Sequence, residues 1–325
     1  MRAVLCEELG PPESLVVREV EDPVPGAGEV VVDMHACGVN FPDVLMIEGK
    51  YQFKPDLPFS PGGEFSGVVS AIGPGVERLA VGDRVVCSAV WGGMAERVLV
   101  SETRAIEVPP GVDMTVAAAF LLAHGTSHYA LKDRGHLRSG ETLLVLGAAG
   151  GVGLAAVELG RLAGARVIAA ASSDEKLELC REYGAAEVVN YATEDLRSRL
   201  KELTGGAGVD VCYDPVGGAL TESAVRAMAW EGRFLVIGFA SGEIPRVPLN
   251  LTLLKGCQIV GVFYGAFAGR EPERHRANTA ELLTWLAEGR LRPHVSASYP
   301  LALAGRAIAD LGERRAQGKV VVTSS

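Results

Sequence analysis

The feature that most constrains this fold is a glycine-rich turn within residues 142–164, which read TLLVLGAAGGVGLAAVELGRLAG. An apolar run precedes the turn, and apolar residues then recur with helical spacing up to Leu162. The pattern predicts a strand, a tight turn and a helix. Glycines keep side chains out of the turn, and the first turn of a helix has N–H groups without helical partners. We therefore expect a dinucleotide pyrophosphate to bind against Ala149, Gly150, Gly151, Val152 and Gly153.

The turn departs from the standard G-x-G-x-x-G fingerprint, because Ala148 replaces its first glycine. Such turns also serve as plain connections between strands and helices. The segments that follow favour the dinucleotide site, since a strand at 166–171, a helix at 174–183 and a strand at 187–191 continue a β-α-β-α-β unit. A helix at 219–230 and strands at 209–213, 232–238 and 258–263 complete a doubly wound parallel α/β sheet.

The rest of the chain has a different pattern. Before residue 110, short strands separated by glycine and proline turns are expected at 3–6, 15–20, 29–37, 67–72 and 84–89. Helices are expected at 113–122 and 126–132. The end of the chain predicts a helix at 279–288, a strand at 296–299, an amphipathic helix at 301–315 and a strand at 319–323. This end is too short for a separate domain, so we expect it to pack on the N-terminal β region.

Composition limits the partners of the chain. The 325 residues carry a net charge of −9 with no block of lysine or arginine, which argues against nucleic acid and anionic membranes as partners. The N-terminus lacks the pattern of a signal peptide, and no apolar run predicts a membrane span. Six cysteines are scattered without C-x-x-C spacing, which is typical of a reducing cytoplasm.

Six short motifs together resemble the medium-chain dehydrogenase/reductases, and in particular their zinc-free quinone oxidoreductase (zeta-crystallin-like) branch. They are CGVNFPD (37–43), PGGE (61–64), VGDRV (81–85), AAGGVG (148–153), DPVGG (214–218) and GKVVV (318–322). The resemblance covers nearly the whole chain. It implies a mainly β, GroES-like catalytic domain over 1–124, a Rossmann NADP-binding domain over 125–263, and a return to the catalytic domain over 264–325.

The same resemblance allows a test for zinc. Metal-dependent relatives have cysteine, histidine and cysteine where this chain has Asn40, Gly63 and Ala123, none of which replaces a thiolate or imidazole ligand. We expect no metal, with His35, His124 and His128 in packing or hydrogen-bonding roles. Without a metal to lower the pKa of an alcohol, the favoured acceptors are quinones, enones and enoyl thioesters, whose oxygen takes up the charge when hydride adds to the conjugated carbon.

The end of the second strand of the sheet favours NADPH over NADH. Ala171 stands where NAD-binding domains commonly have an acidic residue. The hydroxyls of Ser172 and Ser173 and the ammonium of Lys176 suit a 2′-phosphate; the alternative for Lys176 is a solvated lysine in the first turn of a helix. The resemblance adds Tyr191 near the adenine and Arg314 as a second phosphate ligand.

At the reactive end, the resemblance implies catalytic roles for Asn40 and Tyr51. Asn40 is expected to hydrogen-bond the nicotinamide ribose or the acceptor oxygen. Tyr51 is expected to donate a proton or hydrogen bond, to leave that task to water, or only to cover the cleft, since its usual pKa makes it a weak acid. Glu64 is expected to form a structural hydrogen bond. Further cofactor contacts are implied for Asn40, Thr126, Tyr129, Gly238, Phe239 and Phe263.

The sequence therefore predicts a zinc-independent oxidoreductase that transfers hydride from NADPH to a quinone or α,β-unsaturated carbonyl in a cleft between two domains. An enoyl-thioester reductase of the same superfamily is the first alternative, and a non-catalytic NADPH-binding protein is the second. We also expect a homodimer, because the apolar residues 258–267 fall at a predicted sheet edge, where strands tend to pair.

Overall fold

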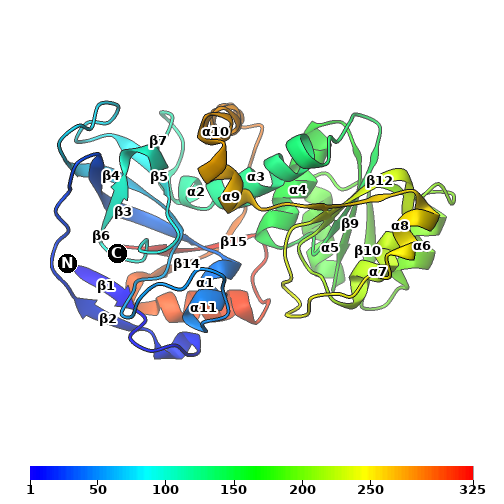
Figure 1. Cartoon of the computed structure of the whole chain (residues 1–325), viewed down its shortest axis with the longest axis horizontal. Helices are drawn as coiled ribbons and strands as arrows, with labels where there is room; N and C mark the ends of the chain where they lie inside the picture. Colours follow the sequence, from blue (N-terminus) through cyan, green and yellow to red (C-terminus); the bar gives the residue numbers. More distant parts are fainter. Residues whose placement is uncertain (325) are drawn as a thin grey trace. The chain divides into compact units, whose positions relative to one another are not determined.

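A parallel sheet and a mixed sheet lie in separate parts of the chain (Figure 1). The computed structural model describes residues 1–324. The first compact unit comprises Met1–Leu122 and the chain from Leu282 onward, and the second comprises Ala123–Glu281. We predicted the return to the N-terminal region at residue 264, whereas residues 264–281 pack within the second unit. Two contacts explain this: Tyr129 stacks on Phe267, and Asp133 pairs with Arg274.

The second unit contains the predicted doubly wound α/β sheet. Its six parallel strands run in the order β10-β9-β8-β11-β12-β13. The chain order reverses between β8 and β11, which is the position where such folds bind nucleotides. The strands are β8 (Thr142–Leu146), β9 (Arg166–Ala171), β10 (Glu187–Asn190), β11 (Val209–Asp214), β12 (Met228–Val236) and β13 (Gln258–Gly261).

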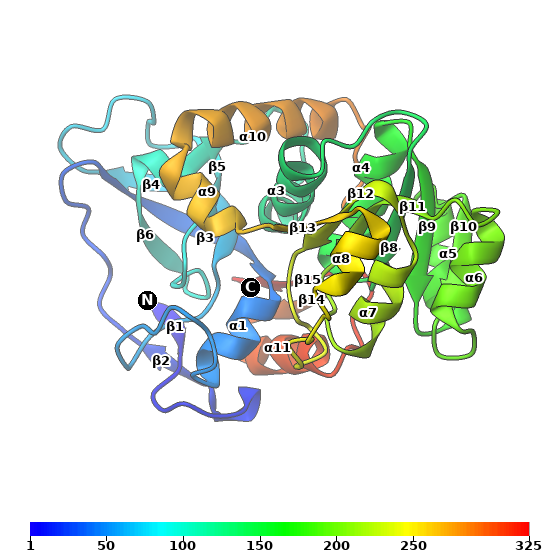
Figure 2. The same ribbon diagram turned by 45° about the vertical axis from the view of Figure 1, so that its right-hand side comes forward.

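Helices cover both faces of this sheet. Helices α6 (Leu196–Leu203), α7 (Ala219–Arg226) and α8 (Asn250–Lys255) lie side by side over one face (Figure 2). The other face receives α4 (Gly151–Leu162), whose Gly160 lies against Leu143 and Val167, and α5 (Asp174–Glu182). Because both faces are covered, β8 is almost uninterruptedly apolar and fully buried from Leu143 to Leu146.

The first unit contains a seven-stranded mixed sheet of order β14-β15-β3-β4-β5-β7, with β6 also paired to β3. These strands are β3 (Glu29–Val39), β4 (Glu64–Ile72), β5 (Arg84–Ser88), β6 (Arg97–Ser101), β7 (Ala105–Glu107), β14 (Val295–Pro300) and β15 (Lys319–Thr323). Strands β1 (Arg2–Leu5) and β2 (Val16–Glu19) form a separate pair. Strand β15 runs antiparallel to β3, with Val320 opposite Val39. This pairing places the start of β15 beside residue 40.

The remaining helices are α1 (Phe41–Ile47), α2 (Met114–Ala118), α3 (Leu121–His128), α9 (Tyr264–Arg270), α10 (Pro272–Ala287) and α11 (Ala304–Gly312). Of these, three belong to the first unit, α9 belongs to the second, and α3 and α10 cross the boundaries between the units along the sequence. A π-helical turn, Tyr129–Arg134, continues α3. Among the described residues, no helix combines the length and the apolar character needed to cross a membrane. All six cysteines are buried and free.

Several predicted elements differ from the structure. The helix predicted at 219–230 ends at Arg226, because Met228 is buried and already pairs with Val209 in the sheet. The helix predicted at 113–122 is broken, since α2 ends at Ala118 and α3 begins at Leu121. The structure also has elements that were not predicted, namely helices α1, α6, α8 and α9 and strands β6 and β7.

Candidate active site

The glycine-rich turn joins β8 to α4 through Gly147–Gly150. A Cβ on Gly153 would lie 2.3 Å from the carbonyl oxygen of Gly147 and 2.9 Å from Cα of Ala148, so only glycine permits this approach of helix and turn. A Cβ on Gly150 would meet only the Gly147 oxygen, at 3.4 Å. Packing of α4 against the turn therefore requires Gly153, whereas Gly150 leaves open space beside the backbone. This open space and the N–H groups that begin α4 fit a pyrophosphate.

Residues predicted for the adenosine end of the cofactor lie after β9 and β10. Ser172 is exposed, while Ser173 is the N-cap of α5 and accepts a hydrogen bond from the Lys176 backbone N–H at 3.4 Å. The backbone N–H of Tyr191 donates to the Ala171 carbonyl at 3.1 Å, which holds the residue after β10 beside the end of β9. The structure thus brings the predicted hydroxyls, Lys176 and Tyr191 to one edge of the sheet.

The remaining predicted cofactor contacts of the second unit also follow its strands. Gly238 and the 37%-exposed Phe239 come after β12, and the 51%-exposed Phe263 comes after β13. Carboxyl ends of parallel strands meet at the same edge, so these residues share an edge with the glycine-rich turn. Thr126 lies on α3 and Tyr129 begins the π-helical turn, with its ring stacked on Phe267 at a centroid distance of 4.0 Å.

Ser127 links α3 to the glycine-rich turn and was not predicted. Its buried Oγ lies 2.9 Å from the Val152 carbonyl oxygen, in the first turn of α4, and 2.9 Å from the Tyr213 hydroxyl. Burial raises the pKa of Tyr213 well above its usual range, so this hydroxyl stays protonated. A small polar residue in a helix carries no sequence signal for this contact, which depends on how three elements pack.

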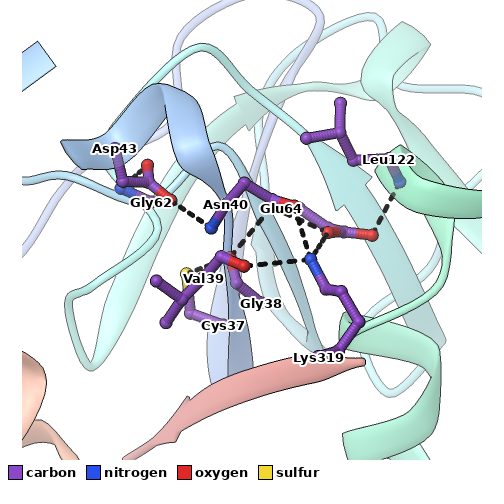
Figure 3. A network of polar contacts seen from close by, with 9 residues as sticks. All are labelled: Cys37, Gly38, Val39, Asn40, Asp43, Gly62, Glu64, Leu122 and Lys319. Carbon is purple, nitrogen blue, oxygen red and sulfur yellow. Dashed lines mark hydrogen bonds and ion pairs between the residues drawn. The ribbon is translucent and has the colours of Figure 1, made fainter. Parts of the chain in front are cut away.

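In the first unit, Asn40 belongs to a buried polar network with Glu64 and Lys319 (Figure 3). Nδ2 of Asn40 donates to Glu64 Oε2 at 3.0 Å and to the Gly38 carbonyl at 3.2 Å. The Lys319 ammonium donates to Asn40 Oδ1, to the Val39 carbonyl at 3.1 Å and to Glu64 Oε2 at 3.2 Å.

Glu64 forms the structural hydrogen bonds that the sequence predicts for it. Besides its contacts in this network, its Oε1 accepts from the Leu122 N–H at 2.8 Å. Its ion-pair partner Lys319 was missed. Lys319 lies in the GKVVV motif, but its distance along the chain from Glu64 hides the pairing.

Asp43 fixes the start of α1 beside this network. Its carboxylate accepts from the backbone N–H of Asn40 at 2.8 Å and from that of Gly62 at 3.0 Å (Figure 3). Burial raises the pKa of Asp43 to about 6, because the desolvation of the charge outweighs the two hydrogen bonds and the nearby Lys319 ammonium. Burial also raises the pKa of the neighbouring Cys37 thiol well above its usual range, which leaves the thiol unreactive.

Tyr51 and Arg314 also lie in the first unit. Tyr51 is half-buried after α1, with Phe53 edge-on at a centroid distance of 5.8 Å. Burial and, to a smaller extent, the charge of Asp43 raise the pKa of Tyr51, so its hydroxyl is suited to donating a hydrogen bond but not to releasing a proton. Arg314 is exposed between α11 and β15, in a left-handed backbone conformation with φ of 60°.

Comparison with known proteins places the whole chain in one family. A family described as zinc-binding dehydrogenase matches residues 151–287, and one described as alcohol dehydrogenase GroES-like domain matches residues 26–110. A quinone oxidoreductase-like protein 2 homolog of Nematostella vectensis is 40% identical, over 99% of this chain and 89% of that protein. The chain belongs to the quinone oxidoreductase family of the medium-chain dehydrogenase/reductase superfamily.

Other members of the quinone oxidoreductase family agree over nearly the full length. A quinone oxidoreductase of Pseudomonas aeruginosa is 36% identical, with 96% of each chain covered. A crystal structure of Escherichia coli quinone oxidoreductase complexed with NADPH is 30% identical, with a TM-score of 0.93 over 99% of this chain and 100% of that chain. These matches confirm the predicted family and fold class.

In this member of the quinone oxidoreductase family, the side chains around Asn40 are not suited to bind a zinc ion. Proteins bind zinc with thiolates, imidazoles and carboxylates. Gly63 has no side chain, and the amide oxygen of Asn40 already accepts from the Lys319 ammonium. A divalent ion on that oxygen would face a fixed positive charge at close range. In the part of the chain that the structure describes, no three His, Cys, Asp or Glu side chains form a group that could hold a metal ion.

Proposed function

We propose that this protein is an NADPH-dependent, zinc-independent reductase of quinones or α,β-unsaturated carbonyls. The observation that carries the proposal is the shared sheet edge, where the glycine-rich turn lies with Ser172 and Lys176 and where Ala171 replaces an acidic residue. The quinone oxidoreductase of Escherichia coli, described as complexed with NADPH, supports the same cofactor here.

The predicted cofactor residues at the start of α4 and after β9 would bind different parts of NADPH. The N–H groups of Gly151, Val152 and Gly153, in the first turn of α4, would hold the pyrophosphate, whereas the Gly150 N–H already donates to the Gly147 carbonyl at 3.0 Å. Ser172 and Lys176 would hold the 2′-phosphate, because a hydroxyl and an ammonium both donate to phosphate oxygens. When bound, NADPH supplies a hydride from its nicotinamide ring.

The proposed class of hydride acceptor rests on which side chains could donate a proton. Asn40, Glu64 and Lys319 are engaged with one another, and the pKa of Tyr51 is raised, so none of them is a ready proton donor. Quinones and enones need only stabilisation of a developing negative oxygen, which a hydrogen bond from Tyr51 or from water can give. An unactivated alcohol needs its proton removed first, a task that zinc performs in metal-dependent relatives.

The test is the rate of NADPH oxidation with four acceptors: 1,4-benzoquinone, 9,10-phenanthrenequinone, a simple enone and crotonyl-CoA. We expect turnover with a quinone or the enone. Turnover with crotonyl-CoA alone would make the protein an enoyl-thioester reductase. NADPH binding with no turnover of any acceptor would support the non-catalytic alternative.

A further inference from the structure

The hydrogen bonds around Asn40 determine which way its amide points. Nδ2 has two protons, and both are donated, to Glu64 Oε2 and to the Gly38 carbonyl. Oδ1 faces the ammonium of Lys319. Turning the amide by 180° would place its NH2 group against the ammonium and its oxygen against a carboxylate and a carbonyl. All three contacts would then become repulsive, so the network permits one orientation.

This orientation leaves Asn40 a single chemical capacity. The three protons of the Lys319 ammonium go to Val39, Asn40 and Glu64. The Lys319 ammonium donates to Oδ1, and an amide oxygen has two lone pairs, so Oδ1 can accept from a second donor. Asn40 is 7% exposed, whereas Lys319 is 5% and Glu64 1% exposed. Asn40 is thus the most exposed member of the network, and its side chain has only an acceptor left for a further hydrogen bond.

We propose that Lys319 and Glu64 are positioning residues that present Asn40 Oδ1 as a hydrogen-bond acceptor to a hydroxyl of the nicotinamide ribose. The inference rests on the proposed NADPH-dependent function. Of the two partners predicted for Asn40, a ribose hydroxyl donates and fits, whereas the oxygen of a quinone or enone needs a donor and does not. The specific role of the pair is therefore binding and orientation of the cofactor.

Fold stability alone does not account for the ion pair. Strand β15 is already fixed on β3 by the pairing of Val320 with Val39 and of Val321 with Gly38. A buried ion pair loses its hydration, and replacing both partners by neutral residues is often neutral for stability. Removing one partner is different, because it leaves a buried charge without compensation.

The decisive variant is therefore the double substitution Lys319→Met/Glu64→Gln. The introduced glutamine side chain can accept from or donate to Asn40, so the amide loses its single orientation while the network stays neutral. We expect the melting temperature to stay within about 5 °C of the wild type. The dissociation constant for NADPH, measured by fluorescence titration, should rise about fivefold, which corresponds to one hydrogen bond. Arg2→Met/Glu96→Gln removes an exposed ion pair from the same unit and should leave NADPH affinity unchanged.

Adding Asn40→Ala to the double substitution distinguishes a positioning role of Lys319 and Glu64 from a general structural effect. If the pair acts through Asn40, the triple variant binds NADPH as weakly as Asn40→Ala alone. The positioning role would be overturned if the fold-losses of NADPH affinity in the double variant and in Asn40→Ala multiplied in the triple variant. It would also be overturned if the double variant bound NADPH like the wild type. Either result would leave the proposed function intact. A wild-type protein that does not bind NADPH would overturn both.

Discussion

Asp43 is the residue whose titration the structure predicts most sharply. Burial raises its pKa from 3.8 to about 6, so the folded state holds a proton that the unfolded state has already lost. Its contribution to stability is complete below about pH 4 and is lost as the pH rises through 6, by about 3 kcal/mol for a shift of this size.

The measurement is the free energy of unfolding of the wild type minus that of Asp43→Asn, from pH 4 to 7. Subtraction removes the titration of the other carboxylates. We expect this difference to shrink by about 3 kcal/mol as the pH rises from 4 to 7, because only the wild type loses stability as the Asp43 carboxyl ionises. A difference independent of pH would contradict the raised pKa.

Lys176 should decide between the two nicotinamide cofactors. Lys176→Met removes the proposed ligand of the 2′-phosphate, so KM for NADPH should rise about tenfold, as expected for a charge-assisted hydrogen bond. KM for NADH should not change. Ser172→Ala is the matched companion, because Ser173→Ala would also remove the N-cap of α5 and destabilise the protein by about 1 kcal/mol. Equal effects on both cofactors would assign Lys176 a structural role.

At the scale of elements, the two glycines of the turn should respond differently to alanine. Gly153→Ala places a methyl group against backbone atoms at 2.3 and 2.9 Å, and should destabilise the fold by about 2 kcal/mol. Gly150→Ala meets only one atom, at 3.4 Å, and its φ of −77° suits alanine, so stability should change by less than about 0.5 kcal/mol.

For NADPH affinity, Gly150→Ala is the variant that should show the specific effect. The methyl group of Gly150→Ala would occupy the space proposed for the pyrophosphate, so NADPH affinity should fall at least about tenfold in a protein that unfolds like the wild type. Thermal unfolding and NADPH titration on the two variants provide the comparison. If Gly150→Ala bound NADPH with wild-type affinity, the proposed pyrophosphate site at this turn would be contradicted.

Elements with a strong local signal could be predicted from sequence. The strands at 166–171 and 319–323 have the predicted bounds, since each is a buried apolar run between polar or glycine residues. Helix α1 was missed because Gly38 and Pro42 suggest a turn, although proline is well suited to the first turn of a helix. The end of α7 was misplaced because the pairing of Met228 with Val209 overrides its helical pattern.

On the scale of the whole molecule, the exposed strand β13 predicts the oligomeric state. It ends the sheet of the second unit, Ile259 is 41% exposed, and the nearby Leu253 and Leu254 of α8 are 80% and 71% exposed. We expect a homodimer, and Ile259→Lys should yield monomers at micromolar concentration by light scattering, because charge on an edge strand opposes pairing. Leu99→Lys, at an exposed position of β6, is the matched control. A monomeric wild type would refute this prediction.

The buried network shows where sequence reasoning ends. The motifs that hold Asn40, Glu64 and Lys319 could be recognised separately, and the glycine-rich turn and the residues after β9 could be located from the strand pattern. The contact between Lys319 and Asn40 depends on β15 pairing with β3 across most of the chain. No local pattern encodes that pairing, so the fixed orientation of the Asn40 amide emerges only in the folded molecule.

The measurement that tests the central claim most directly is the ratio of kcat/KM for NADPH to that for NADH in the reduction of 9,10-phenanthrenequinone, with and without a metal chelator. We predict a ratio of at least about ten, on the basis of the 2′-phosphate contacts at Lys176 and Ser172, and no effect of the chelator. A ratio below one, or activity that the chelator abolishes and zinc restores, would contradict an NADPH-dependent, zinc-independent reductase.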